Sequence, residues 1–143
     1  MYLPFQMYFS LRFVLWLKWI DNRLGYQNLD DYIYHNVLPQ EKANELWKPL
    51  IVFQNNDESR VLQFDPSSDG IFVNKTGKST ETKLNDLKEA KIFNPHETEV
   101  VWRGVHLLRF KCHFDLYYLP FDTQTCFVEV ISINSLDNLN ITL

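Results

Sequence analysis

Residues 111–127 read KCHFDLYYLPFDTQTCF, and this stretch decides the fold. It contains both cysteines of the chain, Cys112 and Cys126, separated by thirteen residues. That spacing matches no zinc site, because such sites need CxxC pairs or histidines at matched offsets. The sequence therefore leaves two alternatives, a disulfide closing a loop or two buried free thiols. Pro120, between two apolar residues, is a candidate for a cis peptide bond in a tight turn.

Two glycosylation sequons bear on the choice between these alternatives. They are Asn74-Lys75-Thr76 and Asn140-Ile141-Thr142. Sequons are used in compartments where disulfides also form, so Asn74 and Asn140 as glycan carriers favour the disulfide. Such a bond would contribute about 3 kcal/mol by restricting the unfolded chain. The loop it closes is rich in apolar residues, which must be covered either by their own domain or by another one.

The composition excludes several classes of function. The chain has 143 residues, 45% of them hydrophobic and 15% aromatic, which suits one globular domain over residues 1–143. Its formal net charge is −4 without a basic cluster, so we expect no nucleic-acid partner. It has four glycines and no glycine-rich phosphate loop, and we expect neither a cofactor nor a metal site. No apolar stretch reaches the roughly 18 residues of a membrane span.

A period-two pattern near the start of the chain predicts a long strand. Apolar side chains alternate from Phe9 to Trp19, while the opposite face carries Arg12, Lys18 and one large ring, Trp16. We expect further strands at 50–53, 61–64, 70–73, 100–113 and 127–133. Residues 75–91 are expected to form a surface hairpin or loop, and residues 30–46 a loop with one short helical turn. Many short strands with frequent turn signals predict an all-β, immunoglobulin-like β-sandwich.

Three motifs together resemble one family. The first is Leu119-Pro120-Phe121-Asp122 between the two cysteines, and the second is Trp19-x-Asp21-x-Arg23-Leu24. The third is Trp47-x-Pro49, with Asn55 eight positions after the tryptophan and Leu50 in place of the usual aspartate. In this order the motifs resemble the Cys-loop receptors, the pentameric ligand-gated ion channels. The resemblance runs from about Phe9 to Ile133.

The resemblance implies a partial extracellular ligand-binding domain, from about the second strand to just past the cysteine loop and incomplete at both ends. The loop tip, Leu119-Pro120-Phe121-Asp122, would press on a membrane domain and couple ligand binding to the pore. Asp122 would order the tip, or simply cap a turn. The implied partners are other subunits in a homo- or hetero-pentamer, a small extracellular ligand, and the membrane through a transmembrane domain outside this chain. The implied location is the extracellular face of the cell membrane, or secretion if the chain is complete.

The family's agonist positions carry unusual residues here. Three aromatic positions correspond to Val14, Gln54 and Ile133, and the arginine that binds an agonist carboxylate in some members corresponds to Trp16. Aromatic faces attract ammonium groups, so a pocket without them gains little from an amine. We therefore expect no acetylcholine-type or glycine-type pocket. Trp16 and Arg103 are left to serve an unusual ligand, although packing is the commoner role of a tryptophan at such a position.

Three functions remain open at this stage: a channel subunit, a soluble secreted binding protein of the same fold, and a structural subunit that binds no ligand. An enzyme is not expected, because the acidic and histidine residues form no recognisable catalytic set. These residues are Asp21, Asp115, Asp122, His106 and His113.

Overall fold

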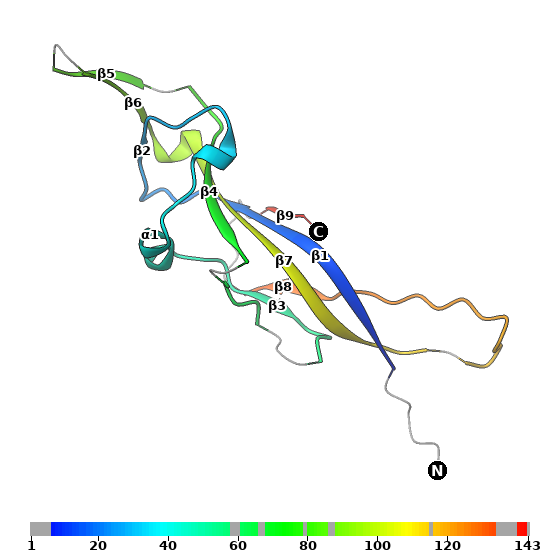
Figure 1. Ribbon diagram of the computed structural model, residues 1–143. Helices are drawn as coiled ribbons and strands as arrows, with labels where there is room; N and C mark the ends of the chain where they lie inside the picture. The colour runs from blue at the N-terminus through cyan, green and yellow to red at the C-terminus, as the bar shows by residue number, and fades with distance from the viewer. Residues whose placement is uncertain are drawn as a thin grey trace. The chain divides into compact units, whose positions relative to one another are not determined.

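The computed structural model describes residues 7–57, 61–65, 68–78, 80–85, 88–114, 116–133 and 140–142. The elements, in chain order, are β1 (Met7–Trp19), β2 (Tyr26–Gln27), η1 (Ile33–His35), α1 (Gln40–Glu45), β3 (Ile51–Phe53), β4 (Gly70–Lys75), β5 (Thr80–Asn85), β6 (Lys88–Phe93), η2 (Pro95–Glu97), β7 (Thr98–Cys112), β8 (Val130–Ser132) and β9 (Asn140–Thr142). The fold is all-β and of the predicted β-sandwich class, with strands far outweighing helices (Figure 1).

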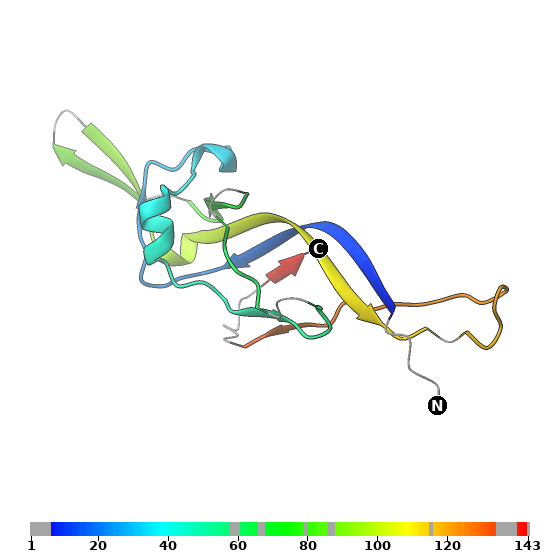
Figure 2. The same ribbon diagram turned by 60° about the horizontal axis from the view of Figure 1, so that its bottom comes forward.

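The strands form three sheets. The largest has the order β4-β7-β1-β9, with the two longest strands, β7 and β1, side by side at its centre (Figure 1). The others are β2-β6-β5, which contains the predicted hairpin, and β3-β8. Figure 2 shows the β5–β6 hairpin in another orientation. By their contacts the described residues divide into two compact units, the first within 7–13, 48–63 and 106–133 and the second within 14–47, 64–105 and 140–142.

The core of the second unit follows from the alternation in β1. Leu15, Leu17 and Trp19 are at most 2% exposed, as the period-two pattern predicts. The inward side chains of the neighbouring strands β4 and β7 complete this core: Ile71, Val73, Val100 and Trp102. The opposite face of β1 carries Trp16 and Lys18, so a slip of one residue would bury a charge.

Phenylalanine rings dominate the core of the first unit. The Phe53 ring makes edge contacts with Phe13 and Phe110, with ring centroids 5.9 and 5.7 Å apart. Phe9 stacks on Phe110 at 5.5 Å. Phe53 and Phe110 are fully buried. Because Phe110 lies two residues before Cys112, this cluster anchors the start of the cysteine loop.

Some of the predicted elements are wrong. Residues 30–46 contain two helical elements, η1 and α1, rather than one turn. Helix α1 has the sequence QEKANE with Ala43 its only buried residue, so it has no apolar periodicity by which to be recognised. The expected strand at 61–64 is reduced to an isolated bridge between Val61 and Val52.

The last predicted strand, 127–133, is shorter than expected. Only β8 forms a ladder, pairing with β3 from Phe53↔Val130 to Ile51↔Ser132. Before it, the Phe127 carbonyl and the Glu129 amide bond to the side chain of Asn55 instead of to a strand. A side chain thus takes over hydrogen bonds that a backbone ladder would otherwise make.

Candidate functional site

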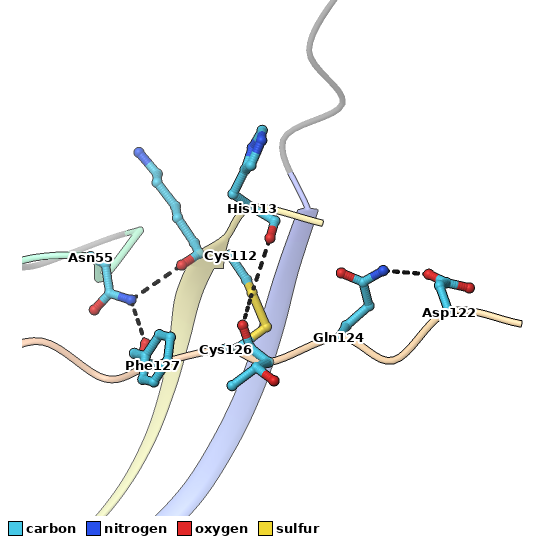
Figure 3. The surroundings of a disulfide bond; sticks show 9 residues. Asn55, Cys112, His113, Asp122, Gln124, Cys126 and Phe127 are labelled. Carbon is cyan, nitrogen blue, oxygen red and sulfur yellow. Dashed lines mark hydrogen bonds between the residues drawn. A yellow bond between two sulfur atoms is a disulfide. The ribbon is translucent and has the colours of Figure 1, made fainter. Parts of the chain in front are cut away.

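The cysteine loop is the most distinctive feature of the first unit. The disulfide expected from the sequence joins Cys112 and Cys126, whose Cα atoms lie 5.6 Å apart (Figure 3). Two turn-like hydrogen bonds fold the loop between them, from the Leu119 amide to the Leu116 carbonyl and from the Phe121 amide to the Tyr118 carbonyl. The Leu119–Pro120 peptide bond is cis, as predicted.

The tip of this loop presents apolar side chains to solvent. Phe121 is 93% exposed, Tyr117 82% and Leu119 66%. Asp122 is half-buried at the edge of the tip, where its carboxylate accepts a hydrogen bond from the Gln124 side chain (Figure 3). Large exposed apolar side chains gathered on one loop are typical of a surface that another surface covers.

The base of the loop is held by Asn55, a residue of the third sequence motif. Asn55 Nδ2 donates to the carbonyl oxygens of Lys111 at 3.2 Å and Phe127 at 2.7 Å, and Figure 3 shows the bond to Phe127. Asn55 Oδ1 accepts from the Glu129 amide at 3.1 Å. Asn55 directly follows Gln54 in a cluster, 55–59, whose composition indicates a turn. Asn55 lies two residues past the end of β3, and its place in the third motif is a sequence signal for this role.

Two of the predicted pocket residues meet in the second unit. The Arg103 guanidinium carbon lies 5.4 Å from the centroid of the Trp16 ring, a cation–π contact between half-buried side chains. Val14 lies on the same face of β1 as Trp16 and is also half-buried. The Trp16 ring, which the sequence predicts as a possible ligand contact, thus already contacts the Arg103 cation of its own chain.

The other two predicted pocket residues lie in the first unit. The Gln54 amide bonds to the Glu129 carbonyl, while the Ile133 amide bonds to the Leu50 carbonyl. These bonds sit at opposite ends of the β3–β8 ladder, so the structure does not bring Gln54 and Ile133 next to each other. Their four-residue offset corresponds to about 13 Å of strand.

The second and third sequence motifs meet around two tryptophans. Trp19 makes an edge contact with Trp47 at 6.4 Å between ring centroids. Two residues after Trp19, the Asp21 carboxylate binds Arg23, with Oδ2 2.6 Å from Nη2 and Oδ1 2.8 Å from Nε. This bidentate bond lowers the pKa of Asp21, outweighing a smaller opposing effect of burial.

Tyr26 lies in the same unit as this pair. Burial first, and then the nearby charge of Asp21, raise its pKa to about 12. The Tyr26 hydroxyl is buried and has no hydrogen-bond partner among the described residues.

The first sequon begins in β4 with Asn74 and ends one residue beyond the strand, at Thr76. Asn74 Nδ2, the atom that would carry a glycan, donates to Glu99 Oε1 at 2.6 Å. A glycosylated amide keeps one N–H, so this bond and a sugar are compatible. Asn140 lies in β9, in register with Lys18. The two asparagines remain predicted glycosylation sites.

Three of the acidic and histidine residues considered for catalysis make contacts with other side chains. Asp21 pairs with Arg23, Asp122 with Gln124, and the His106 ring packs against Phe13 at 5.9 Å. His113 is exposed, and Asp115 lies outside the described residues. Within the described ranges, no three His, Cys, Asp or Glu side chains are grouped to hold a metal ion.

Comparison with known proteins identifies the fold that carries these features. The family model of the neurotransmitter-gated ion-channel ligand binding domain matches residues 4–141. The chain belongs to this family. The ligand-binding domain is similar to the neuronal acetylcholine receptor subunit alpha-4 of Mustela putorius furo, with 29% identity over 115 residues. The match covers 78% of this chain and 14% of that subunit. No solved structure shows a significant match.

The family is that of the ligand-binding domains of neurotransmitter-gated ion channels. None of the helices in the described part of the chain has the length and apolarity that a membrane crossing requires.

Proposed function

We propose that this chain is part of the extracellular domain of a ligand-gated channel subunit and that its disulfide loop couples ligand binding to the pore. The observation that carries the proposal is the loop tip, where a covalently closed segment presents Phe121, Leu119 and Tyr117 to solvent. Family membership supplies the context of a neurotransmitter-gated channel.

The energetics of the tip favour a covering surface. Fully burying one such aromatic or aliphatic side chain is worth about 1.5–3 kcal/mol. Three such side chains on this loop are exposed to water, so their burial free energy is gained only if a second surface covers them. We propose that this surface is the transmembrane domain of the same subunit, reached at the extracellular face of the cell membrane.

The ligand side of the proposal departs from the relative named as an acetylcholine receptor subunit. Val14, Gln54 and Ile133 offer no ring faces at the positions carried over from the family, and Arg103 already occupies the face of Trp16. A quaternary ammonium at the Trp16 ring would have to displace the Arg103 guanidinium, and the two positive charges would repel each other. We propose that this subunit contributes no acetylcholine-type site of its own and assembles with other subunits in a pentamer.

A second candidate function has one observation in its favour. Because Arg103 already lies over the Trp16 ring, the chain also suits a structural subunit that shapes the pentamer while its neighbours bind the ligand. The two candidates differ in one measurable respect, since a structural subunit gives no current alone and changes the currents of the subunits that it joins.

The experiment uses the full-length subunit, expressed in oocytes alone and together with acetylcholine-receptor subunits. Phe121→Ser should lower the maximal current evoked by acetylcholine in the mixed receptor, with unchanged surface expression and unchanged binding of a labelled agonist. Thr123→Ser, an exposed polar position two residues away, serves as the matched control. Full current with Phe121→Ser, or a subunit that never reaches the surface with any partner, would refute the proposal.

A further inference from the structure

The side chain of Asn55 bridges the two ends of the disulfide loop. Its amide nitrogen donates to Lys111 O at 3.2 Å and to Phe127 O at 2.7 Å, and the bond to Phe127 is drawn in Figure 3. Its oxygen accepts from Glu129 N at 3.1 Å. An asparagine amide offers two N–H groups on one nitrogen and one acceptor oxygen, and the nitrogen makes two hydrogen bonds and the oxygen one here. The side chain is half-buried, so water competes for these bonds less than at an open surface.

The positions of these partners relative to the disulfide are the key observation. Lys111 immediately precedes Cys112, and Phe127 immediately follows Cys126. The disulfide joins the entering and leaving ends of the loop covalently. One residue further from the tip on each end, Asn55 joins the same two ends by hydrogen bonds. The loop base therefore has two successive cross-links, one covalent and one polar.

The backbone around Asn55 strengthens this arrangement. The Lys111 amide donates to the Asn55 carbonyl at 2.8 Å and the Gln54 amide to the Glu129 carbonyl at 2.9 Å. The Asp57 amide donates to the Arg109 carbonyl at 2.9 Å, and the Asp57 carboxylate lies 3.7 Å from Lys111 Nζ. Segment 54–57 is thus hydrogen-bonded to both ends of the loop at once.

We infer that Asn55 is a positioning residue for the coupling loop, which fixes the loop base to segment 54–57 so that the tip moves with that segment. The inference rests on the coupling role proposed above, and Gln54, next to Asn55, is one of the predicted ligand-pocket positions. Displacement of segment 54–57 would then reach the loop through the Asn55 amide. Loss of this amide should impair transmission and leave ligand affinity unchanged.

Few residues can replace Asn55 in this geometry. Aspartate has nearly the same shape and keeps the acceptor for Glu129, but it has no donor and sets a negative charge against two carbonyl oxygens. Alanine removes all three bonds without adding charge. The pair Asn55→Asp and Asn55→Ala therefore separates the hydrogen-bonding role from simple space filling.

The test measures amide hydrogen exchange in the purified full-length receptor, in peptides covering residues 109–112 and 127–130. We expect Asn55→Ala to speed exchange there by about tenfold to hundredfold, since two or three hydrogen bonds that resist local opening are lost. Asn55→Asp should speed exchange at least as much. Gln63→Ala, an exposed position in the same unit, should leave exchange within about twofold of wild type. Wild-type exchange in Asn55→Asp would show that shape alone matters and would overturn the inference.

A double-mutant cycle with the disulfide adds a second readout. Asn55→Ala should speed hydrogen exchange more when Cys112 and Cys126 are both replaced by serine than when the disulfide is present. With the disulfide intact, the two loop ends stay joined after the Asn55 hydrogen bonds are lost. Additive effects would contradict the idea that they hold the same two ends. If the serine pair fails to fold, the comparison of Asn55→Asp with Asn55→Ala decides alone.

Current recordings then connect the contact to gating. In a mixed receptor stimulated with acetylcholine, Asn55→Ala should lower the maximal current with unchanged agonist binding. Altered exchange with normal current would show that Asn55 holds the loop but does not transmit, and the positioning role would be rejected. Absence of current in every wild-type assembly would reject the proposed channel function instead, while the exchange measurement would still decide whether Asn55 holds the loop base.

Discussion

The contact between Arg103 and Trp16 supports the proposal that this chain has no acetylcholine-type site, and it is open to direct measurement. Replacing Arg103 with glutamine removes the guanidinium that lies 5.4 Å from the ring centroid. Cation–π pairs are worth about 0.5–1 kcal/mol at exposed sites and about 2 kcal/mol when desolvated. Because both side chains are half-buried, we expect a coupling energy of about 1 kcal/mol.

The assay is a double-mutant cycle of Arg103→Gln and Trp16→Leu, read as the free energy of urea unfolding of the extracellular domain. Lys18→Gln provides the matched control, because Lys18 lies two residues from Trp16 on the same face of β1 and pairs with Glu99 at 3.9 Å instead. The Trp16–Lys18 cycle should show less than about 0.3 kcal/mol of coupling. Equal coupling in the two cycles, or none in either, would refute the claim that Arg103 specifically occupies the ring.

Three further perturbations test other parts of the structure. The pKa of Asp21 is lowered by Arg23, so this pair should stabilise the fold fully above about pH 4 and lose its effect as pH falls through the lowered folded pKa; unfolding midpoints of wild type and Arg23→Gln should therefore converge in acid, and parallel curves would contradict this. Leu17 is fully buried in β1, so Leu17→Ala should cost about 2–5 kcal/mol of unfolding free energy in a denaturation experiment, and a cost under 1 kcal/mol would contradict its place in the core. Asn74→Gln should remove one glycan from protein made in eukaryotic cells, seen as faster migration on a gel, and unchanged migration would exclude Asn74 as a glycan carrier.

The sequence predicted the features that depend on local pattern. The alternation in β1 correctly places Leu15, Leu17 and Trp19 in the core, and most of the β5–β6 hairpin lies in the polar stretch 75–91. The cysteine spacing together with the two sequons indicated the disulfide that the structure contains. The alternation, the polar stretch and the cysteine spacing each depend on residues close together in the chain.

The sequence did not predict features that depend on distant residues. Asn55 looked like a turn residue, because its partners lie 56 and 72 positions away in the chain. Trp16 and Arg103 are both predicted as possible ligand contacts, but no sequence pattern indicates that they contact each other across neighbouring strands. The helix at Gln40–Glu45 was missed because a six-residue segment with one buried alanine carries no periodic signal.

The central claim is that the exposed tip of the disulfide loop is covered by the membrane domain of its own subunit. A photo-crosslinking amino acid placed at Phe121 in the full-length subunit, in native membranes, tests it most directly. We expect an intramolecular adduct between position 121 and a transmembrane helix or its linkers, located by mass spectrometry. Adducts only with soluble proteins, or none at all despite surface expression, would contradict it.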